Sequence, residues 1–274
     1  MGEQLTWHDE WANVDQANTP EFFVKFLDLT RGKWIEMARA DPREFYSFLD
    51  IKNGHQILDI GCGTGDLLRP LAESIDRSCR IVGMDNSEIM ISEAVRRAEG
   101  LNLPMEYRMG DAHALDIADD SFDRCYANFV FMHLQRPVQA LAEIKRVLRP
   151  GALIVVDEPD WDTQVINAGN IQLTRKLIHF MSDIMPNGII GRQLPALFHE
   201  SGFVDIEVSG QITTWPNYEV FREWWMDGGL AHARSAGIVS AEDLAEWLHD
   251  LEERDKTGRF FSAFTTYRVS GRKP

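Results

Sequence analysis

Short apolar runs alternate with helical patterns through the centre of the chain. Apolar residues at helical spacing predict helices over 66–75 and 137–148. A further helix would follow Ser87, which can act as its N-cap, and Pro150–Gly151 ends the pattern of the 137–148 helix. Strands that alternate with helices in this way predict a parallel sheet with helices on both faces. Buried strands are predicted at 56–60, 80–85, 105–109, 122–128 and 152–157.

The sequence on either side of this α/β core is mostly helical. Residues 1–50 show helical spacing interrupted by Pro20 and Pro42, and 217–257 form a helical insert before the last strand. Both segments could cover a ligand crevice of the core. The remaining elements are helices at 171–185 and 192–202 and two strands, antiparallel to each other, at 203–210 and 260–271.

The composition is globular and acidic. Of 274 residues, 28 are Lys or Arg and 43 are Asp or Glu, which gives a net charge of −15. This charge argues against a nucleic acid or an anionic membrane as partner, because both bind basic surfaces. We also expect no membrane span, no secretion signal, no disulfide framework and no metal, because long apolar runs and C-x-x-C spacings are absent. A cytoplasmic location is the expectation.

A glycine-rich turn follows the first predicted strand, in L-D-I-G-C-G-T-G (58–65), and opens a helix. Gly61 and Gly63 allow a tight turn that a ligand can approach closely, and Gly65 permits close packing of the helix on the strand. The G-x-G-x-G spacing differs from the G-x-G-x-x-G of dinucleotide-binding folds. The context of strand, turn and helix therefore predicts a nucleotide-type site of another kind.

The charges near this turn favour a cationic ligand. The second strand ends at Asp85, whose carboxylate can bind both hydroxyls of a ribose. Asp59 and Asp66 add negative charge, which makes a poor cradle for a pyrophosphate. A nucleoside that carries positive charge suits these residues better.

With these motifs the sequence resembles the class I S-adenosylmethionine-dependent methyltransferases, and most closely their ubiquinone/menaquinone-biosynthesis type and its small-molecule relatives. The resemblance implies a Rossmann-like, mostly parallel sheet of seven strands, with the antiparallel last strand between the fifth and sixth. It also implies a single methyltransferase domain over 1–274. Four segments carry it most strongly: 58–65, 83–94, 110–123 and 141–158.

The resemblance also implies S-adenosyl-L-methionine as cofactor and assigns residues to it. Asp85 would bind the ribose, Asn128 the methionine part, and Arg43 the carboxylate. Met90 could pack on the adenine or in the core, and Cys62 is a small residue within the turn. The expected cofactor-binding set is Arg43, Gly61, Cys62, Gly63, Asp85, Asn86, Met90, Asp111, Ala112 and Asn128.

Catalytic residues are harder to predict. His133 lies just past the fourth strand, where a histidine could act as general base or only pack in the loop. Glu158 could orient the substrate or act as base, or belong with Asp157 and Asp160 to a solvated acidic rim. Tryptophans outside the sheet could line an apolar pocket or only hold helices in place, namely Trp7, Trp11, Trp215, Trp224 and Trp225.

The sequence thus predicts methyl transfer to a small, largely apolar or aromatic metabolite, at an oxygen, nitrogen or carbon atom. The enzyme would consist of a helical cover (1–50), a cofactor-binding core (51–158) and a substrate-side region (159–274) with a lid at 217–257. A homo-oligomer is one assembly that the sequence allows. The alternatives are a quinone-precursor C-methyltransferase, a non-catalytic S-adenosylmethionine-binding scaffold and, with less support, an NAD-linked oxidoreductase.

Overall fold

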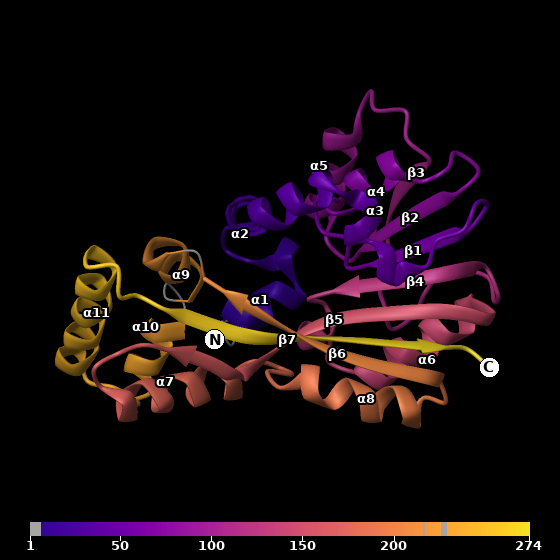
Figure 1. Cartoon of the computed structure of the whole chain (residues 1–274). Coiled ribbons are helices and arrows are strands. Elements are labelled where there is room, and N and C mark those ends of the chain that lie inside the picture. Colours follow the sequence, from indigo (N-terminus) through magenta and orange to yellow (C-terminus); the bar gives the residue numbers. More distant parts are fainter. Residues whose placement is uncertain (1–6, 216, 226–228) are drawn as a thin grey trace.

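The computed structural model describes residues 7–215, 217–225 and 229–274, and a seven-stranded sheet organises it (Figure 1). The strand order is β3-β2-β1-β4-β5-β7-β6, with β1 to β5 parallel and β7 antiparallel between β5 and β6. This confirms the predicted fold class. The strands are β1 (Gln56–Ile60), β2 (Arg80–Asp85), β3 (Met105–Met109), β4 (Phe122–Asn128), β5 (Leu148–Ile166), β6 (Val204–Thr214) and β7 (Ser262–Arg272).

Helices cover both faces of the sheet, as strands buried along almost their whole length, such as β1 and β4, require. The crossovers from β1 to β2 and from β2 to β3 place α4 and α5 on one face, and α6 and α8 lie on the other (Figure 1). Ser87 caps α5 by accepting the backbone N–H of Met90, as expected. These helices are α4 (Leu68–Ser74), α5 (Glu88–Ala98), α6 (Pro137–Val147) and α8 (Ile190–Glu200).

The N-terminal segment is helical, and its prolines begin helices. Pro20 and Pro42 are the first residues of α2 and α3, where a proline lacks no needed hydrogen bond. Asp41 caps α3 by accepting the backbone N–H of Glu44 at 3.1 Å. The elements are α1 (Trp7–Ala12), α2 (Pro20–Ala40), α3 (Pro42–Phe45) and the 3₁₀ helices η1 (Val14–Gln16) and η2 (Ser47–Leu49).

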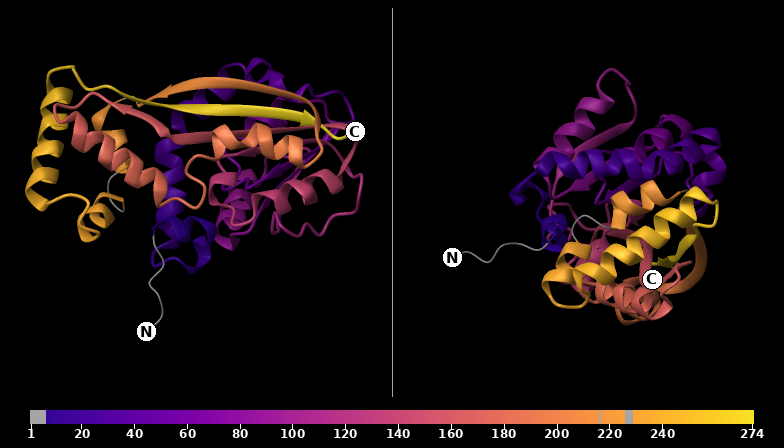
Figure 2. Two further views of the ribbon diagram at one scale, coloured as in Figure 1. Left: turned by 90° about the horizontal axis from the view of Figure 1, so that it is seen from below. Right: turned by 90° about the vertical axis from the view of Figure 1, so that its left-hand side faces the viewer.

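The helical insert packs away from the core, on an extension of the sheet. Figures 1 and 2 show β5 and β7 running past β1 and β4 toward α7, α10 and α11. Trp247 of α11 is buried there and donates from Nε1 to Thr174 Oγ1 of α7 at 2.9 Å. The helices are α7 (Ile171–Asp183), α9 (Tyr218–Trp225), α10 (Gly229–Ser235) and α11 (Ala241–Lys256).

Strand β5 is much longer than predicted, and this corrects the interpretation of its acidic residues. Asp157, Glu158 and Asp160 lie within the strand and are buried, not on a solvated rim. The two aspartates have charged partners distant in sequence, and Glu158 accepts backbone N–H groups of the loop after β4. Asp157 pairs with Arg268 of β7, and Asp160 pairs with Arg192 of α8. Because buried carboxylates are rare without partners, three of them in one segment suggested exposure.

The Asp157–Arg268 pair joins β5 to β7 beside the end of β4. Arg268 donates from Nε and Nη2 to the two carboxylate oxygens, each at 2.7 Å, and Tyr126 of β4 donates its hydroxyl at 2.9 Å. The Arg268 guanidinium also lies over the Phe48 ring, 3.4 Å from its centroid. The Asp157 backbone carbonyl accepts the N–H of Phe129, so this pair underlies the loop after β4.

Candidate functional site

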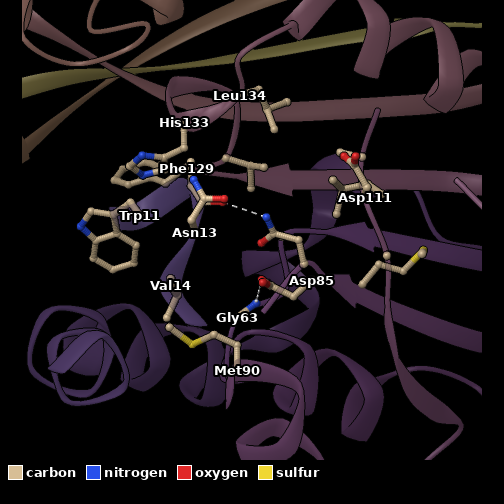
Figure 3. Close-up of a pocket in the computed structure, with 18 of the residues that line it drawn as sticks. Trp11, Asn13, Val14, Gly63, Asp85, Met90, Asp111, Phe129, His133 and Leu134 are labelled. Atoms are coloured by element: carbon tan, nitrogen blue, oxygen red, sulfur yellow. Dashed lines mark hydrogen bonds between the residues drawn. The ribbon is translucent and has the colours of Figure 1, made fainter. Parts of the chain in front are cut away.

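A cavity of about 280 Å³ lies at the carboxyl ends of β1, β2 and β4 (Figure 3). Open parallel sheets bind ligands at these ends, where consecutive connections leave on opposite faces. The cavity walls come from the loops after β1 to β4 and from the N-terminal segment. Eight of the predicted residues line it: Gly61, Gly63, Asp85, Asn86, Met90, Asp111, Ala112 and His133.

The glycine turn is built as its spacing suggested. Gly61 has a φ of +68°, and a Cβ there would lie 2.4 Å from Val130 of the loop after β4. Gly65 has a φ of +70°, and a Cβ there would collide with the Tyr107 hydroxyl of β3. The left-handed conformation and the lack of space both require glycine at these positions. The turn therefore leaves its backbone open toward the cavity.

Asp85 ties the loops around the cavity together. One carboxylate oxygen accepts the Gly63 N–H at 2.8 Å (Figure 3). The other accepts the Ser87 N–H at 3.1 Å. Burial raises the pKa of Asp85, while these N–H donors and the charge of Arg31 act in the opposite direction. Each oxygen keeps a lone pair for a ligand hydroxyl.

Fewer acidic groups around the turn face the cavity than the sequence suggested. Burial raises the pKa of Asp59 to about 8, and Asp59 does not line the cavity. Asp66 is buried behind the turn, where Arg69 and Arg97 pair with it. Among the four predicted aspartates, only Asp85 and Asp111 reach the cavity wall.

Arg31 of α2 is the residue that sequence reasoning missed. It lines the cavity, and its positive charge acts on both Asp59 and Asp85. Arg43, the predicted cation, is exposed on α3 and does not line the cavity. Helix α2 carries several cations, and its sequence gives no sign of which one faces the site, because that depends on how α2 docks.

Three further predicted residues lie outside the cavity lining. Cys62 points into the core beside α4, and its N–H donates to the Met84 carbonyl at 2.9 Å. Asn128, at the end of β4, is buried, and its Nδ2 has no hydrogen-bond partner in the part of the chain that the structure describes. Glu158 lies below the loop after β4.

Glu158 holds the short helix that carries His133. Its carboxylate accepts three consecutive N–H groups, from Val130 and Phe131 at 2.6 Å and from Met132 at 3.3 Å. These donors start the 3₁₀ helix η3 (Phe131–His133). Complete burial raises the pKa of Glu158 to about 8, against the effect of the three N–H groups. Glu158 therefore positions the loop and has no access to the cavity.

The N-terminal segment covers the cavity and is fastened at three points. Asp15 of η1 accepts the Ser87 hydroxyl and the Glu88 N–H at 2.6 Å and the Ile89 N–H at 3.2 Å. Asn86 donates to the Ala12 carbonyl at 3.0 Å. The Trp11 ring stacks on His133 with 5.6 Å between centroids (Figure 3). Asp15 thus caps α5 from outside its own element.

The predicted lid at 217–257 has no described residue in the cavity lining, so α1 and η1 form the observed cover. Of the tryptophans, Trp11 lines the cavity, and Trp215 packs against Phe221 and Phe264. The side chains of Trp7, Trp224 and Trp225 fall outside the described residues.

Replacing Asp15 with alanine is expected to loosen this cover. The variant removes three bonds to the start of α5, and we expect a loss of about 1 kcal/mol in the free energy of unfolding, the usual value for a lost cap. Amide exchange at Glu88 and Ile89 should become faster. Asp15→Asn, which keeps one acceptor oxygen, should fall between the variant and the parent. Unchanged exchange at both amides would contradict the fastening role.

Comparisons with known proteins agree with this geometry. A methyltransferase-domain family model matches residues 58–156. An uncharacterized 37.1 kDa protein in a transposon of Streptomyces fradiae is 37% identical over 243 residues, which are 85% of this chain and 67% of that protein. Methyltransferase GfsG of Streptomyces halstedii is 31% identical over 52% of this chain and 54% of its own length.

A demethylmenaquinone methyltransferase of Bacillus cereus is 32% identical over 48% of this chain and 56% of its own length. The chain thus spans about half the length of these two named relatives. Among solved structures, the YcgJ protein of Bacillus subtilis aligns with a TM-score of 0.60 at 16% identity, over 84% of this chain and 96% of its own.

Phosphoethanolamine N-methyltransferase 2 of Haemonchus contortus, in complex with S-adenosyl-L-methionine, aligns with a TM-score of 0.58 at 17% identity. That alignment covers 99% of this chain and 61% of the nematode chain. These two structures agree in fold with the present one. Four findings lead to one conclusion: the glycine turn, the aspartate that ends β2, the inserted antiparallel strand and the matched family model. The chain carries a methyltransferase domain with the class I fold, whose cofactor is S-adenosyl-L-methionine.

Proposed function

We propose that this chain transfers the methyl group of S-adenosyl-L-methionine to a small, largely apolar or aromatic metabolite. The observation that carries the proposal is the Asp85 carboxylate at the end of β2, beside the open backbone of Gly61 and Gly63. A dinucleotide would need a third glycine at position 66, where Asp66 stands. The site therefore suits a single nucleoside better than NAD.

The residues present fit this cofactor. Asp85 would bind the ribose hydroxyls, and Asn86, Met90, Asp111 and Ala112 would surround the adenine. Arg31 would replace the predicted Arg43 as the partner of the cofactor carboxylate, because Arg31 lines the cavity with the glycine turn and Arg43 does not. Asn128, expected at the methionine part, ends β4 outside the cavity lining, and its buried Nδ2 has no partner among the described residues.

The acceptor would bind next to the cofactor, against aromatic and apolar side chains. Trp11, Phe129 and Leu134 line the cavity from the cover and from the loop after β4. The bound cofactor supplies an activated methyl group on a sulfonium. The protein aligns the acceptor with it and excludes water, and such positioning can lower a barrier by about 7–11 kcal/mol. Glu158 contributes by fixing η3, and His133 is the candidate base at the cavity wall.

Related chains are named for different acceptors, including demethylmenaquinone and phosphoethanolamine. The mixed wall of Trp11, Phe129 and Leu134 favours an aromatic ring over a phosphate group. A quinone precursor methylated at carbon fits the same wall and is the second candidate. In the ranges that the structure describes, no helix is long and apolar enough to cross a bilayer. The three cysteines are buried free thiols, which suits a reducing cytoplasm.

The proposal is tested with a panel of phenols, indoles, quinols and amines, in which methylated product is detected by mass spectrometry. We expect a product with one of the aromatic classes. If the chain binds S-adenosyl-L-methionine but methylates none of them, a non-catalytic cofactor-binding scaffold becomes the better interpretation.

His133→Ala is expected to separate chemistry from binding. If His133 removes a proton from the acceptor, its loss should lower turnover about 100-fold, at the low end of general base catalysis, and leave cofactor affinity within about threefold. His133→Phe keeps a ring against Trp11 and controls for the lost stacking contact. Equal turnover of the parent and both variants would exclude His133 as base.

A further inference from the structure

Strand β6 is an edge of the sheet with unusual features for an edge. It is 11 residues long, and within the described ranges it pairs only with β7. Residues 208–214, V-S-G-Q-I-T-T, contain no charge and no proline. Proteins usually protect such edges with charges, prolines or short strands, because the unpaired backbone recruits other strands. Figure 2 shows β6 along the outer margin of the molecule.

The backbone groups that point outward can be assigned from one hydrogen bond. Trp215 donates its N–H to the Ser262 carbonyl at 2.9 Å, so residue 215 faces β7. The pairing with β7 is regular over 207–214, and residues alternate in direction along a strand. Val208, Gly210 and Ile212 therefore direct their N–H and C=O groups away from β7, toward the free edge.

The same segment of β6 also exposes two apolar side chains. Ile212 is 78% exposed and Val208 is 51% exposed, and both lie on one face of the sheet. Glu207, Ser209 and Gln211 lie on the other face and are polar. An exposed isoleucine and valine four residues apart would be covered by a strand that places apolar side chains opposite them.

We propose that β6 pairs with β6 of a second copy of this chain, antiparallel and centred on Gly210. In this register Val208 of each copy opposes Ile212 of the other, and about six backbone hydrogen bonds form between residues 208, 210 and 212. Four apolar side chains then meet on one face. The two seven-stranded sheets become one continuous sheet.

Charge is compatible with this register and disfavours one alternative. Glu207 would oppose Thr213 of the second copy, and Asp205 would oppose Trp215, so no like charges meet. A pairing centred on residue 206 would place Asp205 opposite Glu207 twice, and like charges at directly opposite positions are destabilising. Gly210 also leaves room at the two-fold axis, since the nearest atoms to a Cβ there, on Tyr267 and Thr265, lie 3.7–3.8 Å away.

The first test is the mass of the chain in solution by sedimentation equilibrium. The small interface predicts a dimer with a dissociation constant in the micromolar range, so at about 100 µM most of the protein should have twice the 31.3 kDa mass of the chain. Ile212→Lys should raise the dissociation constant at least about 100-fold. Val95→Lys changes another exposed apolar residue, on α5, and should leave the dissociation constant unchanged. A monomeric parent at this concentration overturns the proposal.

The second test reads the register. The natural cysteines are buried, so an introduced surface cysteine would be the accessible thiol among the described residues. Gly210→Cys should form a disulfide between copies under mild oxidation, because position 210 faces itself across the axis within disulfide reach. Ser209→Cys should not, because Ser209 would oppose Gln211. Cross-linking through 209 in preference to 210, or a dimer that Ile212→Lys leaves intact, contradicts the pairing. Cofactor affinity should stay unchanged in all these variants, since β6 is remote from the cavity.

Discussion

Asp85→Ala is expected to abolish measurable binding of S-adenosyl-L-methionine, with affinity reduced at least about 1,000-fold. The carboxylate would make two charge-assisted hydrogen bonds to the ribose, each worth about 1.5–3 kcal/mol. The same carboxylate joins Gly63 to Ser87, so its loss also loosens the turn that approaches the cofactor. Calorimetric titration of the parent and the variant measures the effect directly.

Two controls make this result specific. Asp183→Ala removes the same charge from the exposed end of α7 and should leave affinity unchanged. Asp85→Asn keeps the shape and one acceptor, and should bind more weakly than the parent but better than Asp85→Ala. The parent should bind S-adenosyl-L-methionine and not NAD. Tight binding by Asp85→Ala would remove this residue from the cofactor site, and failure of the parent to bind would overturn the assignment of the cavity.

Arg268→Ala is expected to produce the largest loss of stability, about 3–5 kcal/mol, because it leaves the buried Asp157 carboxylate without its cation. The Tyr126 hydroxyl would remain as a donor to Asp157, so the variant protein should still fold at low temperature. Because the backbone carbonyl of Asp157 accepts the Phe129 N–H, displacement of Asp157 should also make the loop after β4 more mobile. Chemical denaturation gives the free energy of unfolding.

The matched comparison removes both charges. Arg268→Met together with Asp157→Asn should recover much of the lost stability, since the neutral pair carries no uncompensated charge. Arg96→Ala, in an exposed pair with Glu93 on α5, should change stability little. If Arg268→Ala behaves like Arg96→Ala, the buried pair does not contribute as its geometry indicates.

The sequence predicted the cofactor half of the fold well, because its signals are local. Strand β1, the glycine turn and Asp85 follow one another within 30 residues, and each needs only short-range rules to be recognised. Ser87 and the start of α5 followed from capping chemistry alone. These residues line the cavity or support it as expected.

The remaining features depend on how distant segments dock. Nothing in the sequence around Asp157 predicts its pairing with Arg268, which is 111 residues away in the chain. The choice between Arg31 and Arg43 follows from the packing of α2, and the cover by η1 follows from Asp15 reaching α5. The sequence leaves Glu158 open between orienting the substrate, acting as base and lying on an acidic rim, and its burial under η3 favours a positioning role.

The extension of β5 and β7 beyond the cavity separates the molecule into two parts with different freedom to vary. The helices α7, α9, α10 and α11 form an apolar cluster of their own on that extension, distinct from the clusters around β1 and β2. Substitutions in this cluster can accumulate without disturbing the bonds of Asp85 or the glycine turn. Such a chain can diverge over generations in its outer part while its inner part stays nearly constant.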